Sequence, residues 1–434
     1  PNSEYIDETY SFLVNAFLTH KDYSSAISSM EVNGLENLRL QQAYQEVSYY
    51  RAVQLFNDGK YHQALEHFEK ALIHTFNKNL QALTHYWKAE TFYRLEDYEN
   101  SIRSFEDFKN TALASSMSEY QSSFYHIGYS YFKLWKFQES IRAMEQFLSN
   151  TTSSDFRLHD AYVRMGDSHY MLKEYQNAIT DYEKAVQLWG VDSDYAAYQI
   201  ALAYQQMDAN QEVVDQLLGF ESAHPKSTYR DDAIYRMGEA YIKLNSFDDA
   251  ISMFSSISSK FPSSPYVADA KMKIGLVYYN SSRYPESIQT FKSIVADYPS
   301  TAIAREAITN ARSAYIDLGD VTSYVDWLET LSFVNMSTAA IDSTTYESAE
   351  LQYLKGDYNK AFKSFQGYIA SYSDGIFNLP AQYYFAQSAL KIDSTDQALQ
   401  AFDRISTLHH NTYTYMAIKQ SAILYQQKER HLDL

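Results

Sequence analysis

The chain has 434 residues, 45% hydrophobic and 21% charged, and its 36 Lys and Arg against 54 Asp and Glu give a formal net charge of −18. So acidic a chain repels phosphate backbones, and nucleic acid is not an expected partner. Zero cysteines exclude disulfides and thiolate metal sites, and no apolar run is long enough to span a bilayer. With only 12 Gly and 7 Pro, the composition favours an all-α fold.

A pattern of about 37 residues recurs along the chain and predicts a series of helical hairpins. Each second helix carries a position, here called the anchor, at Ala26, Ala64, Ser101, Ser140, Ala178, Val213, Ala250, Ser287, Tyr324, Ala361 and Ala398. Twelve residues earlier, in the first helix, a position that is small in nine of eleven copies is held by Val14, Ala52, Ala89, Gly128, Gly166, Ala201, Gly238, Gly275, Arg312, Ala349 and Ala386. We call it the first-helix small position.

Four residues after each anchor the side chain is large and apolar: Met30, Phe68, Phe105, Met144, Tyr182, Leu217, Phe254, Phe291, Leu328, Phe365 and Phe402. Three residues before the anchor an aromatic residue usually opens the second helix, at Tyr23, Tyr61, Tyr98, Phe137, Tyr175, Phe247, Tyr284 and Tyr358. Small positions facing large ones let two helices approach closely. Because one hairpin cannot bury both its apolar sides, the copies are expected to stack on one another.

This arrangement resembles the tetratricopeptide repeat (TPR), which has small residues at its eighth and twentieth positions and an aromatic at its twenty-fourth. The match covers almost the entire chain, with two departures. The period exceeds the usual length of about 34 residues, and the ninth copy has Arg312 and Tyr324 at its small positions. The resemblance implies an all-α, right-handed superhelical solenoid of about 11 TPR-like helix-turn-helix repeats, continuous over residues 1–434, with a possible subdomain break at 335–345.

Two segments, Y-I-D-E-T-Y-S-F-L-V-N at the start and Y-Y-R-A-V-Q-L-F-N-D-G-K-Y from Tyr49, look like the long TPR proteins of the Gram-negative cell envelope. This finer resemblance implies a periplasmic or outer-membrane-associated location, with a cytoplasmic one as the alternative. It also implies that the chain is part of a longer one. Residues from Thr412 onward are expected to form one more helix without a partner helix.

The sequence has no motif typical of a nucleotide, zinc or nucleophile site: no G-x-x-x-x-G-K-S/T, no H-E-x-x-H and no G-x-S-x-G. Its closest histidine pairs, His62 with His67 and His409 with His410, do not share a helical face well. We therefore expect no catalytic residue, no bound metal and no cofactor.

In the resembling family, groove residues lie three before, one after and four after the first-helix small position. The first of these registers gives a row of tyrosines, Tyr49, Tyr86, Tyr125, Tyr198, Tyr235, Tyr346 and Tyr383. The second gives the acidic residues Glu90, Asp167, Glu239 and Glu350, and the third includes Tyr93, Phe132 and Tyr170. Tyrosine suits peptide recognition because it offers a large contact area with a polar tip. The alternative is that these rings fill the space between adjacent first helices.

The predicted function is that of a non-catalytic scaffold, which binds a partner peptide or helix in this groove, possibly within envelope, outer-membrane assembly or secretion machinery. The alternative is an adaptor or regulatory segment of a larger enzyme or signalling protein. The acidic positions predict a neutral to basic partner. A clamp for acidic C-termini is not expected, because Asn15 stands alone and Ser11 replaces the required Lys. If the register is right, replacing Tyr86, Tyr125 and Tyr235 with Ala weakens partner capture and leaves the fold intact.

Overall fold

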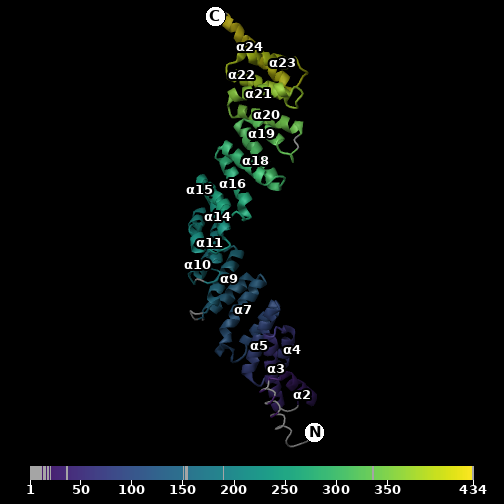
Figure 1. Ribbon diagram of the computed structural model, residues 1–434, viewed down its shortest axis with the longest axis vertical. Coiled ribbons are helices and arrows are strands. Elements are labelled where there is room, and N and C mark those ends of the chain that lie inside the picture. The colour runs from purple at the N-terminus through teal and green to yellow at the C-terminus, as the bar shows by residue number, and fades with distance from the viewer. Residues whose placement is uncertain are drawn as a thin grey trace. The chain divides into compact units, whose positions relative to one another are not determined.

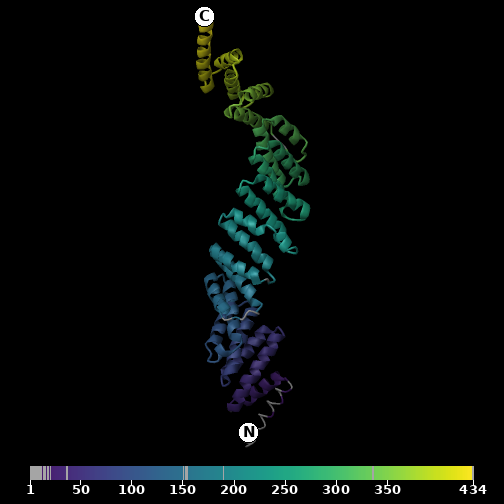
Figure 2. The same ribbon diagram turned by 90° about the vertical axis from the view of Figure 1, so that its left-hand side faces the viewer.

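The computed structural model describes residues 21–35, 38–149, 151, 155–188, 190–334 and 337–432, together with Phe12, Ala16 and Thr19. All regular secondary structure in this described part is helical, which confirms the all-α class. The chain divides into two compact units, Pro1–Tyr229 and Arg230–Leu434. Within each unit, every helix packs chiefly on the helices before and after it, as a solenoid requires, and Figure 1 and Figure 2 show this succession from two directions.

The described helices of unit 1 start with the second helix of the first copy and continue through five hairpins. Its described helices are α2 (Tyr23–Asn33), α3 (Leu38–Asn57), α4 (Tyr61–Ile73), α5 (Lys78–Arg94), α6 (Tyr98–Lys109), the 3₁₀ turn η1 (Ala114–Ser116), α7 (Glu119–Lys133), α8 (Phe137–Ser149), α9 (Arg157–Met171), α10 (Tyr175–Leu188), α11 (Ser193–Gln206), α12 (Asn210–Leu217) and α13 (Phe220–Ala223). The second helix of the sixth copy is interrupted between α12 and α13 by Gly219, whose φ is +86°. Val14, Asn15 and Ser11, on which two sequence interpretations rest, lie outside the described residues.

Unit 2 contains five further hairpins and a final helix. Its described helices are α14 (Arg230–Lys243), α15 (Phe247–Lys260), α16 (Tyr266–Asn280), α17 (Tyr284–Asp297), α18 (Ala302–Leu318), α19 (Val321–Glu329), α20 (Thr338–Leu354), α21 (Tyr358–Ser371), α22 (Asn378–Lys391), α23 (Thr395–Ser406) and α24 (Thr412–Leu432). The expected irregular connection at 335–345 is mostly the first part of α20, and residues 335–336 lie outside the described part. The division into units falls at Tyr229 instead.

The small-to-large pattern forms the core of every described hairpin. All eleven anchors and all eleven large residues four positions later are buried. At the first-helix small position every described copy is buried except Arg312. The Arg312 side chain leaves the hairpin core to donate hydrogen bonds to Thr344 Oγ1 at 2.9 Å and to Glu347 at 2.6 Å. Arg312, which replaces the usual small residue of the ninth copy, thus links that copy to the tenth.

Glycine at the first-helix small position permits helix contacts that no side chain would allow. A Cβ added at Gly166 would lie 2.6 Å from the Tyr182 ring, and one at Gly275 would lie 2.5 Å from the Phe291 ring. Where the anchor is serine, its hydroxyl strengthens the same contact, because Ser287 Oγ donates to the Gly275 carbonyl at 2.9 Å. Close packing of small on large residues therefore sets the spacing within these hairpins.

Every hairpin turns through a left-handed residue five positions before the anchor. These residues are Lys21, Gly59, Glu96, Trp135, Lys173, Asp208, Asn245, Ser282, Gly319, Gly356 and Asp393, with φ between +56° and +83°. In the described turns the next residue donates its amide to the carbonyl five residues earlier, as Lys60 does to Leu55 at 2.8 Å. This is the Schellman ending of a helix, for which glycine or asparagine is preferred. The recurrence of this turn eleven times agrees with the number of repeats predicted from the sequence.

Candidate protein-binding site

The tyrosines three before the first-helix small position lie mainly in the core. Tyr49, Tyr86, Tyr198, Tyr235, Tyr346 and Tyr383 are between 4% and 8% exposed, and Tyr125 is half-buried. Rings this deeply buried contribute to packing between hairpins, as the alternative interpretation proposed. The expectation that replacing Tyr86, Tyr125 and Tyr235 leaves the fold intact is therefore revised, because loss of Tyr86 and Tyr235 would open cavities in the core.

Three buried tyrosines of this row each stack on an aromatic ring that stands near the start of the next first helix. Tyr198 stacks on Tyr229 with ring centroids 5.0 Å apart, and Tyr235 stacks on Tyr266 at 4.9 Å. Tyr346 stacks on Phe377 at 4.7 Å. Burial raises the pKa of Tyr235 to about 12, so its hydroxyl stays neutral at physiological pH. In unit 2 these stacked pairs join successive first helices.

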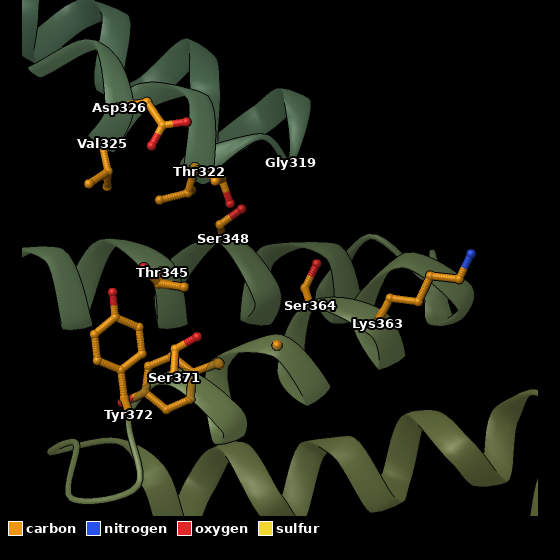
Figure 3. Close-up of a pocket in the computed structure, with 13 residues that line it drawn as sticks. Gly319, Thr322, Val325, Asp326, Thr345, Ser348, Lys363, Ser364, Ser371 and Tyr372 are labelled. Atoms are coloured by element: carbon orange, nitrogen blue, oxygen red, sulfur yellow. The ribbon is translucent and has the colours of Figure 1, made fainter.

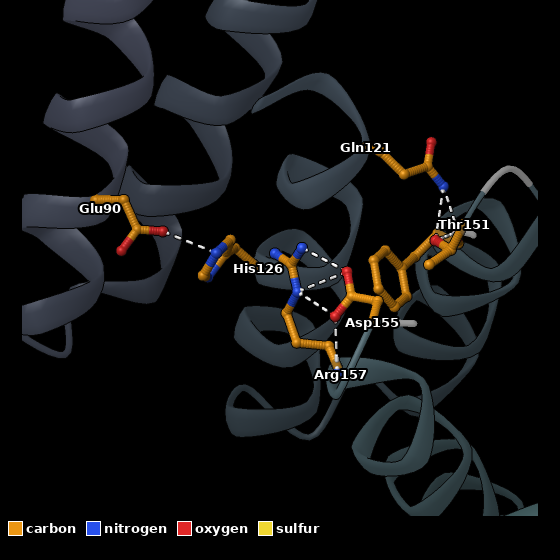
Figure 4. Close-up of polar contacts among 7 residues, drawn as sticks. Glu90, Gln121, His126, Thr151, Asp155 and Arg157 are labelled. Carbon is orange, nitrogen blue, oxygen red and sulfur yellow. Dashed lines mark hydrogen bonds and ion pairs between the residues drawn. The ribbon is translucent and has the colours of Figure 1, made fainter. Parts of the chain in front are cut away.

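The four predicted acidic positions are occupied by carboxylates that already have partners inside the chain. Glu90 lies 3.0 Å from His126 Nε2, a contact shown in Figure 4 beside the paired Asp155 and Arg157. Glu239 accepts hydrogen bonds from Arg236 at 3.1 Å and from Lys273 at 3.2 Å. In the tenth repeat, Tyr346 donates its hydroxyl to Glu350 at 2.9 Å.

Asp167 is the most densely bonded of the four. Its Oδ1 accepts the hydroxyls of Tyr182 and Tyr195, each at 2.8 Å, and Arg164 Nη1 donates to its Oδ2 at 2.8 Å. Burial raises the pKa of Asp167, with the Arg164 guanidinium acting in the opposite direction. Arg164 also donates to Asp160 at 3.2 Å, and Asp160 accepts the Tyr125 hydroxyl at 2.7 Å. This network ties α7, α9, α10 and α11 together.

The aromatic residues four after the first-helix small position are half-buried and keep part of their surface open. Tyr93, Phe132 and Tyr170 each contact the aromatic residue that opens their own second helix, with ring centroids 5.8, 5.9 and 5.4 Å apart respectively. Phe56, Tyr279 and Tyr353 make the same contact in other copies at 5.4 to 5.7 Å. Of the three predicted registers, this one combines fixed geometry with accessible surface.

In unit 1 these rings belong to a larger half-buried surface that we call the aromatic row, made of Tyr93, Tyr125, Tyr129, Phe132, Arg164 and Tyr170. Tyr129 links two hairpins, with its ring centroid 6.0 Å from that of Tyr93 and 6.1 Å from that of Tyr125. The Arg164 guanidinium lies over the rings of Tyr129 and Phe132 at 5.9 and 5.7 Å. Such cation–π contacts hold the rings in fixed positions.

Sequence reasoning missed the basic residues two before the first-helix small position. His126, Arg164, Arg236 and Lys273 occupy it in the fourth, fifth, seventh and eighth copies, and each contacts a predicted acidic residue. Their recurrence at one position of the repeat is visible in the sequence and could have indicated partners for the acidic residues. The ring partners of the buried tyrosines were also visible, since Tyr229, Tyr266 and Phe377 each stand 31 residues after the tyrosine on which they stack.

A separate cleft of about 430 Å³ lies in unit 2 between α19, α20 and α21. Hydroxyl groups from Thr322, Thr345, Ser348, Ser364, Ser371 and Tyr372 line it, with Lys363 at its edge (Figure 3). None of the predicted groove residues borders it.

Among the described helices none has both the length and the apolar composition needed to cross a membrane. The described His, Asp and Glu residues form no cluster of three or more that could hold a metal ion.

Helical hairpins that stack through small-to-large contacts and left-handed turns define a TPR-type α-solenoid. Residues 159–188, which include most of α9 and all of α10, match the family model of the tetratricopeptide repeat. Residues 227–308 match the model of an outer membrane lipoprotein family, YfiO. The resemblance to TPR proteins inferred from the sequence is thus confirmed. No curated protein matches the chain by sequence.

Solved structures of TPR proteins show low similarity to the chain. A tetratricopeptide repeat protein from Parabacteroides merdae ATCC 43184 is 13% identical over 62% of this chain and 98% of its own, with a TM-score of 0.38. MamA is 19% identical over 40% of this chain and 93% of its own, with a TM-score of 0.33. YrrB, described as a TPR protein with an unusual peptide-binding site, is 16% identical over 46% of this chain and 96% of its own, with a TM-score of 0.35.

Proposed function

We propose that the chain is a non-catalytic protein-interaction scaffold that binds a peptide or helix of a partner along the aromatic row of unit 1. The observation that carries this proposal is the row itself. Its rings come from three successive first helices, keep part of their surface accessible, and are fixed by Arg164 and the aromatic contacts between hairpins. A rigid aromatic surface loses little conformational entropy on binding, so its contact area contributes efficiently to affinity.

The partner is proposed to be neutral to basic, in keeping with the net charge of −18. Because Glu90, Asp167, Glu239 and Glu350 are engaged inside the chain, they do not act as free anionic anchors for a basic side chain. The charge of the whole chain instead steers a basic partner toward the surface and mainly raises the association rate. Contact with the rings then supplies most of the affinity.

Site-specific photo-crosslinking tests this proposal without emptying the core. A benzoylphenylalanine replaces Tyr129 or Tyr170 in the aromatic row, and as a matched control it replaces Glu183, an exposed residue of the second helix α10. We expect one and the same cellular protein to crosslink at positions 129 and 170 and not at 183, as identified by mass spectrometry. Adducts at 183 alone, or different proteins at each position, would remove the aromatic row as the binding surface.

We further propose that the scaffold acts in the cell envelope. The support is the match of residues 227–308 to an outer membrane lipoprotein family, together with the resemblance of two segments to envelope TPR proteins. Fractionation of cells that express the full-length gene, with detection by an antibody against this chain, tests the location. Recovery with the periplasm or outer membrane agrees with the proposal, and recovery with the cytoplasm contradicts it.

A further inference from the structure

One hairpin turn of unit 1 differs from the other ten. At the left-handed position, seven turns carry Asp, Asn, Ser, Glu or Lys and three carry Gly, whereas the turn between α7 and α8 carries Trp135 with a φ of +60°. Every residue other than glycine has a Cβ that approaches the backbone carbonyl in this region, and a bulky residue is an outlier there. Tryptophan is therefore an unusual residue for this turn.

The Trp135 side chain makes few contacts with the rest of the fold. Its side chain is 72% exposed, and its one recorded ring contact is with Phe137, at a centroid distance of 5.9 Å. The backbone bonds of this turn, from Trp135 to Phe132 and from Lys136 to Tyr131, would form with any residue type. The turn needs the left-handed conformation but not an indole, so the choice of tryptophan at this exposed position is a reason to look for a function.

The charges beside Trp135 indicate the chemistry of the surface that it would contact. Lys133 and Lys136 flank it, both are exposed, and neither ammonium group has a carboxylate within ion-pair distance among the described residues. Lys133 instead lies over the Tyr129 ring at 5.5 Å. In an acidic chain this turn thus presents two lysines without described carboxylate partners around an apolar centre, with Glu139 in the following turn of α8. Such an arrangement complements a surface with an apolar pocket and carboxylates at its rim.

We propose that Trp135, Lys133 and Lys136 form a second docking site, which takes an acidic segment of a partner protein. This site goes beyond the binding along the aromatic row. Tryptophan is enriched among the residues that dominate protein interfaces, and lysines at the rim select acidic partners and speed association. A protein is favoured over an anionic bilayer, because a bilayer would meet the wider surface of a chain whose net charge is −18.

Display of random short peptides on phage tests this site with a defined probe. The immobilised full chain selects peptides after counter-selection on the Trp135→Asn variant, which folds because Asn245 occupies the equivalent turn. We expect the selected peptides to combine Asp or Glu with apolar residues. Synthetic versions should bind the variant at least about thirtyfold more weakly in fluorescence anisotropy, since loss of a dominant interface tryptophan has that size.

The double variant Lys133→Glu, Lys136→Glu tests the contribution of charge while keeping the indole. It should weaken binding of the acidic peptides and reverse its salt dependence, because added salt then screens a repulsion. An Asp208→Trp chain that also carries Trp135→Asn is the matched control. Asp208 holds the equivalent left-handed position, and Gln206 and Ala209 stand there in place of the two lysines, so its new tryptophan should not restore binding. The proposal is overturned if no selected peptide depends on Trp135, if the selected peptides lack acidic residues, or if phosphatidylglycerol vesicles bind through Trp135 and peptides do not.

Discussion

At the scale of single residues, adding a Cβ is expected to change the stability in opposite directions at two helical glycines. Gly166 lies under the Tyr182 ring, which a Cβ would approach to 2.6 Å, whereas a Cβ at Gly367 in α21 would meet nothing within 4 Å. We expect Gly166→Ala to cost about 1–3 kcal/mol through overpacking. Gly367→Ala should add about 0.5–1 kcal/mol, because alanine restricts the unfolded chain and favours the helix. Chemical denaturation of the two variants measures both changes.

A compensating variant is best made in the eighth hairpin, because Phe291 lies against Gly275 and carries no polar group. Gly275→Ala with Phe291→Leu reproduces the natural pair of Ala201 and Leu217 in the sixth hairpin, and we expect it to recover part of the stability that Gly275→Ala loses. Equal losses in the single and double variants would show that helix spacing in this hairpin does not depend on the contact between positions 275 and 291.

The left-handed turns give a second residue-scale prediction that does not depend on any partner. Replacing asparagine by tryptophan in such a turn should cost up to about 1–2 kcal/mol, the penalty that the Cβ imposes in this region, which asparagine offsets by local hydrogen bonds. Asn245→Trp should therefore lower the free energy of unfolding, and Trp135→Asn should raise it or leave it unchanged. Differential scanning calorimetry compares the two exchanges. If Trp135→Asn is the more destabilising of the two, the exposed indole has a structural role that its one ring contact does not reveal.

At the scale of helices, the hydrogen-bond network of Arg164 joins four elements of unit 1. Removing the guanidinium in Arg164→Gln would leave Asp160 and the buried Asp167 without their cation. We expect a loss of about 3 kcal/mol, typical of a broken buried ion pair. Arg283→Gln is the matched control in unit 2, since Arg283 makes comparable contacts with Asp248 and Glu286 on the surface, and it should have no measurable effect. Hydrogen exchange of α9 and α17 measures the two local stabilities.

The helices themselves were predictable because their signal is local and repeated. Anchors such as Ala178, large residues such as Tyr182 and the openers such as Tyr175 recur at fixed spacing, and each repeat confirms the assignment of the others. Burial of the predicted groove tyrosines was not predictable in the same way. Whether Tyr198 faces a ligand or a neighbour depends on Tyr229, which lies one hairpin later. Contacts between hairpins therefore require the stacking distance, which a single-helix pattern does not contain.

At the scale of the whole molecule, acid is expected to weaken unit 1 selectively. Burial lowers the pKa of His67, His85 and His159, all of them in unit 1. The buried Nδ1 atoms of His67 and His85 have no hydrogen-bond partner in the described part of the chain. In unit 2 the histidines whose burial the structure describes, His409 and His410, are exposed near the C-terminus. Protonation therefore has a larger energetic effect in the first unit.

The direction in which the stability of unit 1 changes with pH follows from proton linkage. The folded-state pKa of these histidines lies below the unfolded value of 6.5, so the unfolded chain binds protons more readily. Their contribution to stability is complete above about pH 6.5 and is lost as the pH falls from there through the lowered pKa. Asp167 acts in the opposite direction, because its pKa is raised by burial, but it belongs to α9 and not to the helices of His67 and His85.

Hydrogen exchange with mass spectrometry on the full chain resolves these contributions by position. Between about pH 7.5 and about pH 5.5, after correction for intrinsic exchange, we expect α4 and α5 to lose protection while α15 and α16 keep theirs. A chain with His67→Gln and His85→Gln should lose this pH dependence, because it lacks the two imidazoles whose lowered pKa couples protonation to unfolding in those helices. Equal loss of protection in both units would instead assign acid sensitivity to the carboxylates that both units share.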